Sequence, residues 1–158
     1  MKRFIELLLI AIGRKDRFDV APTEEEWESL IETANKQTMI GVAFSAIERL
    51  PKEQRPPRDT IIRQYMFVQH IETRNEKLTE SCVKMIKHLH SNGFEACILK
   101  GQGNALLYPE HLRKRRMCGD IDVWTLPKGY KEKGELASIR MVIDHVHKLT
   151  PGTKATYH

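Results

Sequence analysis

The chain has 158 residues, of which 41% are hydrophobic and 30% are charged. This composition excludes a disordered chain and provides enough apolar material for one domain with a helical extension. The formal net charge of +5 is compatible with nucleic acid, nucleotide phosphates or an acidic partner, and equally with a solvated basic surface.

The cysteines and the N-terminus indicate a cytoplasmic protein without a membrane anchor. Cys82, Cys97 and Cys118 are odd in number and widely spaced, so neither a zinc knuckle nor a disulfide framework is indicated. Free thiols suit a reducing cytoplasm. Residues 4–12 are too short a run to span a bilayer, and their apolar residues recur with the spacing of one helix face. We expect a buried amphipathic helix there.

Residues 1–92 are expected to form a helical N-terminal region. Thr23, followed by three glutamates, has the pattern of an N-cap, and a further helix is expected over about residues 40–50. Between residues 58 and 90 there is neither proline nor glycine, and apolar residues recur every three or four positions. This pattern predicts one long helix, or two with a kink near residues 73–75.

The pattern changes after Gly93, and residues 93–158 are expected to form a separate core. The expected elements are a strand over 94–99, a helix over 102–108, a strand over 120–126, a helix over 131–149 and the start of another strand over 154–158. The fold class is therefore α+β, with a helical part followed by a small mixed sheet. We expect that sheet to be incomplete at its C-terminal end.

Asp120 and Asp122 are the first candidates for chemistry. Residues i and i+2 of a strand point to the same face, so the two carboxylates would lie side by side. A divalent cation that both coordinate would relieve their repulsion, and Mg²⁺ prefers oxygen ligands. The alternative is a solvated strand face, because an Asp-x-Asp sequence is common.

A second candidate is the sequence Leu99-Lys100-Gly101, at the expected junction of a strand and a helix. Glycine there allows the backbone to approach a phosphate, and the free amides of the following helix attract an anion. The alternative is a plain tight turn. A dinucleotide-binding turn is disfavoured, because Leu106 occupies the position of the third small residue.

Four consecutive cations, residues 113–116, precede the acidic pair. Such a run is usually a solvated loop. Its position also suits a guanidinium that neutralises a triphosphate held between the turn and the metal ions.

In this order, the motifs resemble a known family. Leu99-Lys100-Gly101, Leu107-Tyr108-Pro109 and the segment from Arg116 through Gly119-Asp120-Ile121-Asp122 to Trp124 resemble the uncharacterised bacterial nucleotidyltransferase-like proteins of the DNA polymerase beta superfamily. The specific resemblance covers about residues 97–126. It implies transfer of a nucleoside monophosphate from a nucleoside triphosphate to a hydroxyl acceptor, with release of pyrophosphate.

The resemblance also implies roles for individual residues. Asp120 and Asp122 would be catalytic and would bind two Mg²⁺ (or Mn²⁺) ions. The nucleotide-binding residues would be Lys100, Gly101, Gln102, Arg116 and Gly119.

One departure leaves alternatives open. The superfamily uses a third carboxylate on a later strand, and the sequence offers no good candidate, since Asp144 lies in an expected helix. The chain is therefore expected to be inactive in this shortened form, or to be a non-catalytic binding or regulatory module. A glycosyltransferase fragment that uses Asp-x-Asp is a further alternative. The acceptor remains open, nucleic acid is not indicated, and an exposed sheet edge offers a route to a homo-oligomer.

Overall fold

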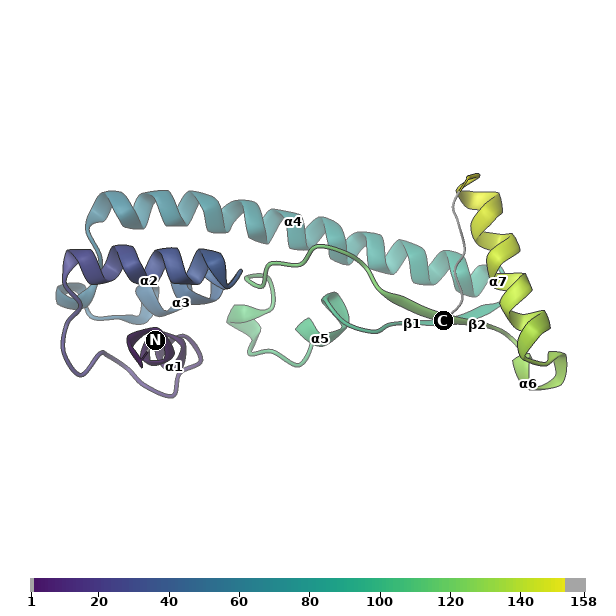
Figure 1. The fold of residues 1–158 in the computed structure, drawn as a ribbon, viewed down its shortest axis with the longest axis horizontal. Coiled ribbons are helices and arrows are strands. Elements are labelled where there is room, and N and C mark those ends of the chain that lie inside the picture. The colour runs from purple at the N-terminus through teal and green to yellow at the C-terminus, as the bar shows by residue number, and fades with distance from the viewer. Residues whose placement is uncertain (1, 153–158) are drawn as a thin grey trace.

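The computed structural model describes residues 2–152, which form an elongated molecule built along one long helix (Figure 1). The helical N-terminal region contains α1 (Lys2–Ala11), α2 (Glu24–Lys36), α3 (Ile40–Arg49), the short 3₁₀ helix η1 (Lys52–Gln54) and α4 (Arg58–Ser91). The helices expected from the sequence are confirmed. The region from residue 58 to 91 is one continuous helix of 34 residues.

Local sequence explains where these helices begin. The Thr23 side chain accepts a hydrogen bond from the Glu26 backbone amide, and the Glu26 carboxylate accepts one from the Thr23 amide, so the capping box at the start of α2 is complete. Proline at position 57 precedes α4, where a missing amide costs nothing. Without an internal proline or glycine, α4 then continues along the whole molecule (Figure 1).

The main hydrophobic core lies among α1, α2, α3 and the first half of α4. Its largest fully buried side chains include Trp27, Phe18 and Leu7. Phe18 and Trp27 pack edge to face with ring centroids 5.7 Å apart. The helical region therefore has the packing of a rigid scaffold.

The second half of α4 carries a small α/β part. β1 (Phe94–Ile98) and β2 (Val123–Pro127) pair antiparallel, with Phe94 opposite Pro127 and Ile98 opposite Val123. The remaining elements are α5 (Gln102–Ala105), the 3₁₀ helix η2 (Glu110–Leu112), α6 (Tyr130–Lys133) and α7 (Glu135–Leu149). The α+β class is confirmed, and in residues 2–152 the sheet consists of these two strands.

Three expected boundaries differ from the structure. α5 ends at Ala105 instead of residue 108, because Leu106 and Leu107 are exposed and give a longer helix no apolar face to bury. The expected helix over 131–149 is interrupted at Gly134, which has a φ of 80°. The strand expected over 120–126 begins at Val123, since β1 ends at Ile98. The strand expected over 154–158 lies outside the described residues.

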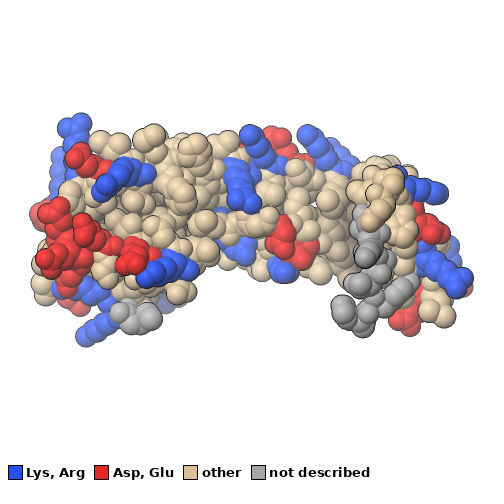
Figure 2. All heavy atoms as spheres, turned by 45° about the horizontal axis from the view of Figure 1, so that its top comes forward, with Lys and Arg blue, Asp and Glu red and all other residues tan. Residues whose placement is uncertain are grey.

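The helices and the surface charge bear on membrane and nucleic-acid binding. Among residues 2–152, no helix has the length and apolar character required to cross a bilayer. On the face drawn in Figure 2, acidic side chains gather at the end of the molecule that carries the helical core, whereas Lys and Arg are scattered along its length. That face therefore has no continuous basic stripe of the kind that tracks a nucleic-acid backbone.

Candidate functional site

The Lys100-Gly101 turn lies directly against the segment that carries the acidic pair. Gly101 has φ 60° and ψ −112°, a conformation that residues with a side chain rarely adopt. A Cβ at this position would lie 2.8 Å from Cys118 Sγ and 3.5 Å from the Asp120 carbonyl oxygen. Only glycine therefore fits, and the two segments that the sequence placed 19 residues apart meet in space.

Asp122 contacts this turn through both its backbone and its side chain. The Leu99 amide donates to the Asp122 carbonyl at 3.0 Å, which extends the pairing of β1 and β2 by one bond. The Lys100 ammonium lies 3.1 Å from Asp122 Oδ2. The hydrogen bond that Lys100 donates to Asp122, and the charges of Asp122 and Asp120, raise the pKa of Lys100, while Arg116 opposes the shift. Lys100 thus interacts electrostatically with the carboxylates of Asp120 and Asp122 and with the guanidinium of Arg116.

Arg116 is the unsatisfied member of this group. Its Nη1 is buried and has no hydrogen-bond partner in the described part of the chain. The same atom lies 3.8 Å from the position that a Cβ on Gly101 would take. A buried guanidinium nitrogen normally has a partner, so this one is suited to an anionic ligand at the turn.

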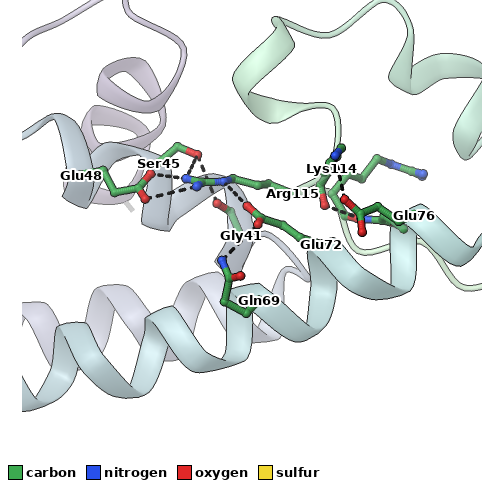
Figure 3. A network of polar contacts seen from close by, with 10 residues as sticks. Gly41, Ser45, Glu48, Gln69, Glu72, Glu76, Lys114 and Arg115 are labelled. Atoms are coloured by element: carbon green, nitrogen blue, oxygen red, sulfur yellow. Dashed lines mark hydrogen bonds and ion pairs between the residues drawn. The ribbon is translucent and has the colours of Figure 1, made fainter.

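The other members of the basic run are engaged elsewhere (Figure 3). Arg115 pairs with Glu48 and Glu72, and it also donates to Ser45 Oγ at 2.9 Å. Burial disfavours the charged form of Arg115, but the hydrogen bonds and charges of Glu48 and Glu72 outweigh it, so the pKa of Arg115 is raised. Arg115 therefore anchors the α/β part of the chain to the helical region.

The first two residues of the run have partners as well. Lys114 pairs with Glu76 on α4 at 2.7 Å, and Arg113 donates to the Tyr108 carbonyl at 3.2 Å. Of the four cations, Arg116 is the one with a buried side-chain nitrogen that has no hydrogen-bond partner among the described residues.

Asn75, on α4, fixes the backbone on both sides of Arg115. It is only 4% exposed, and its Nδ2 donates to the carbonyl oxygens of Lys114 at 2.7 Å and Arg116 at 2.6 Å. Its own carbonyl accepts from Gln102 Nε2 at 2.9 Å. The Gln102 side chain, which the sequence predicted to contact the nucleotide, thus contacts α4 instead. The backbone amide of Gln102 is the group that is left for a phosphate. Sequence reasoning missed Asn75, although it lies four residues after Ile71 on the buried stripe of α4.

Two pockets flank the chain between Arg116 and Gly119. One, of about 330 Å³, is mainly apolar and includes Arg116. The other, of about 210 Å³, includes Gly119 and Arg74. Thr38 and Met117 belong to both walls. Thr38 has a φ of 54°, a strained value for a residue with a side chain, and such strain concentrates at functional sites. Neither Thr38 nor Arg74 was a candidate from the sequence.

The donor set fits part of a two-metal site. Asp120 and Asp122 are accessible, and the Lys100 ammonium shows that Asp122 accepts a cation at this place. Gly119 has open space around its Cα, so a ligand can approach the backbone beside Asp120. Within residues 2–152, however, no group of three or more metal-ligating side chains is found. The described chain offers the pair without the third carboxylate.

Comparison with known proteins now adds the chemical class. The sequence model of a family described as "Uncharacterised nucleotidyltransferase" matches residues 23–136. The chain belongs to this family. The match spans the helical region from α2 onward, the glycine turn, the basic run and the acidic pair, so the nucleotidyltransferase elements lie within one continuous segment. No curated protein and no solved structure matches this nucleotidyltransferase family member.

Proposed function

We propose that this chain binds a nucleoside triphosphate with Mg²⁺ (or Mn²⁺) and moves its nucleoside monophosphate to a hydroxyl acceptor, releasing pyrophosphate. The observation that carries the proposal is Arg116 Nη1, which has no hydrogen-bond partner among the described residues and lies beside the Gly101 turn, where Lys100 interacts with the charges of Asp120 and Asp122. A triphosphate supplies the anionic oxygens that this arrangement lacks.

Each group then has a role in phosphoryl chemistry. Asp120 and Asp122 hold the metal ions, which when bound polarise the α-phosphate and lower the pKa of the acceptor hydroxyl. The amides of Gly101 and Gln102 have no hydrogen-bond partner among the described residues, so they are available to the phosphate oxygens. In the transfer, the acceptor hydroxyl gives its proton to solvent water, its oxygen forms a bond to the α-phosphorus, and the bond from the α-phosphorus to the oxygen that bridges to the β-phosphate breaks, so that pyrophosphate leaves.

Lys100 would change partners when the substrates bind. In the structure it neutralises Asp122, whose carboxylate the metal ion requires. Triphosphate oxygens at the turn would give the ammonium a new partner. Metal and nucleotide binding should therefore be positively coupled. In Lys100→Met, we expect Mg²⁺ alone to bind up to about fivefold more tightly, as removal of an exposed pair allows, and the nucleotide more weakly. Lys87→Met, an exposed lysine on α4, is the matched control.

The direct test is isothermal titration of the full chain with Mg²⁺ and each nucleoside triphosphate. Second-shell losses alone weaken metal binding by about 10- to 100-fold, so Asp120→Asn and Asp122→Asn should weaken it by at least about 100-fold. Asp144→Asn removes an exposed carboxylate from α7 and should leave binding unchanged. Equal metal binding by wild type and Asp120→Asn would disprove the proposal.

A non-catalytic binding module is the second candidate, favoured by the absence of a three-member acidic cluster from residues 2–152. It predicts nucleotide binding without transfer of label from an α-labelled triphosphate to any acceptor. Transfer that Asp120→Asn abolishes would instead support the enzyme. Thermal-shift comparison with sugar nucleotides tests the glycosyltransferase alternative, which requires the sugar nucleotide to stabilise more than the triphosphate.

Two further proposals concern the state of the protein in the cell. The free thiols of Cys82, Cys97 and Cys118 suit a cytoplasmic location. Each strand of the described pair has one edge without a described partner strand, which would allow pairing with a second copy. Light scattering after size exclusion tests the second proposal, and a monomer over the micromolar range refutes it.

A further inference from the structure

The larger pocket lies at the junction of the helical region and the α/β part, next to the nucleotide site. On the side of the helical region, the pocket is lined by Ile12, Met39 and Val42. On the side of the α/β part, it is lined by Leu112 and Met117. Its volume of about 330 Å³ is at the lower end of the range for small-molecule sites. Ile12, at the end of α1, is 46% exposed, so apolar surface is open there.

Arg116 joins this pocket to the site of phosphate binding. It is the one cation in the pocket wall, and its Nη1 also faces the Gly101 turn, 3.8 Å from where a Cβ would be. An anionic group in the pocket would therefore lie beside the phosphates and share the same guanidinium. The apolar walls would hold whatever that group is attached to.

We propose that this pocket binds the acceptor, and that the acceptor is a compact hydroxyl compound with an apolar or aromatic body and one anionic group. The proposal rests on the nucleotidyl-transfer function proposed above, and it adds the substrate class. A nucleobase has polar edges, but among the described residues Thr38, Tyr108 and Arg116 are the only ones that bring polar side chains to the wall. An apolar body needs no such partners, so the lining suits the acceptor better than the base.

A pair of fluorescent probes tests the chemistry of the pocket. 8-Anilinonaphthalene-1-sulfonate has an aromatic body and one anion, and N-phenyl-1-naphthylamine has a similar body without the anion. We expect the sulfonate to bind the full chain at one site, about tenfold more tightly than the neutral probe, because a charge-assisted contact adds about this factor. Arg116→Gln should remove that preference. No saturable sulfonate binding, or a preference that Arg116→Gln leaves intact, would overturn the proposal.

Filling the pocket tests its location. Val42→Phe places a ring in the pocket wall, whereas Val83→Phe makes the same change at an exposed position of α4. Val42→Phe should weaken sulfonate binding by about tenfold or more, which corresponds to a lost anchor of about 1.4 kcal/mol. Val83→Phe should match wild type. Ile12→Trp blocks the same pocket from an exposed position, so it remains informative where Val42→Phe disturbs folding. Equal binding by all three variants and wild type would refute the location.

Saturating Mg²⁺ and triphosphate distinguish the acceptor from the base. Retained or tighter sulfonate binding supports an acceptor pocket, whereas competitive displacement by the nucleotide assigns the pocket to the base and overturns the proposal. Failure here is distinguishable from failure of the proposed function. Suppose that Asp120→Asn weakens metal-dependent nucleotide binding but Val42→Phe leaves sulfonate binding unchanged. The proposed function would then stand, and only the assignment of the acceptor to this pocket would be wrong.

Discussion

Replacing Gly101 by alanine tests the close approach on which the site depends. At φ 60° and ψ −112°, a side chain imposes backbone strain of about 1–3 kcal/mol. The new Cβ would also lie 2.8 Å from Cys118 Sγ, and Cys118 is only 7% exposed, so the thiol has little room to retreat. Overpacking of this kind costs about 1–3 kcal/mol. We therefore expect Gly101→Ala to lower the free energy of unfolding by about 3 kcal/mol.

Urea denaturation followed by circular dichroism measures this loss, and a double-mutant cycle separates its two causes. Cys118→Ala removes the sulfur, so the double variant Gly101→Ala/Cys118→Ala keeps the backbone strain but loses the steric clash. The double variant should then be more stable than the sum of the single effects predicts, by about 1 kcal/mol or more. Triphosphate affinity of Gly101→Ala should fall as well, because the turn holds the phosphates.

Gly119→Ala is the matched control for stability. A Cβ there meets nothing within 4 Å, and its backbone does not require glycine. Its free energy of unfolding should change by no more than about 0.5 kcal/mol. Strict additivity in the Gly101 and Cys118 cycle, or equal effects of the two glycine substitutions, would refute the close packing of the turn against the acidic segment.

Four other predictions concern the scaffold. Gly41→Ala should destabilise the fold by at least about 2 kcal/mol in urea, since its Cβ would lie 2.1 Å from the Arg115 carbonyl oxygen and backbone must move. Asn75→Ala should cost about 2–4 kcal/mol, because two partly buried carbonyl oxygens lose their donor. Iodoacetamide should modify exposed Cys97 well before buried Cys82, as peptide mass spectrometry would show. Burial raises the pKa of the Cys82 thiol, so the unfolded chain ionises first and stability should fall above the ordinary thiol pKa.

Each of these has a contradicting outcome. A Gly41→Ala variant as stable as wild type would mean that α3 and the basic run do not touch. An Asn75→Ala variant with unchanged stability would mean that Asn75 does not hold the run. Modification of Cys82 at the rate of Cys97 would exclude its burial. For Asn75, Asn35→Ala at an exposed helical position is the control and should cost less than about 0.5 kcal/mol.

The sequence predicted correctly those features of the structure that depend on residues close to one another in the chain. The capping box at Thr23, the uninterrupted α4 and the glycine turn at Gly101 depend on neighbouring residues, and the structure contains all three. The strand of the acidic pair began three residues later than expected, because its start depends on where β1 ends. Strand boundaries need the partner strand, which spacing within one segment does not provide.

Long-range contacts account for what the sequence did not predict. Asn75 and the carbonyl oxygens it binds are 39 and 41 residues apart. Arg115 and Glu48 are 67 residues apart. The basic run looked like four equivalent cations, and only the fold separates Arg115, which is paired with Glu48 and Glu72, from Arg116, whose buried Nη1 has no hydrogen-bond partner among the described residues. Arg115 and Arg116 have the same side chain, and they differ in the residues that the fold places around them.

The contrast between these two neighbours explains how the helical region serves the site. Arg115 is held from α3 and α4 by Glu48 and Glu72, and Asn75 holds the carbonyls on either side of it. With its backbone fixed in this way, Arg116 keeps its guanidinium beside the Gly101 turn without any side-chain partner of its own at Nη1. A free arginine would lose rotamer freedom when it bound an anion, and a pre-positioned one loses less. If the proposed anion site is correct, the helices that precede residue 93 contribute to its affinity by positioning Arg116, although the acidic pair lies entirely on the other side of that boundary.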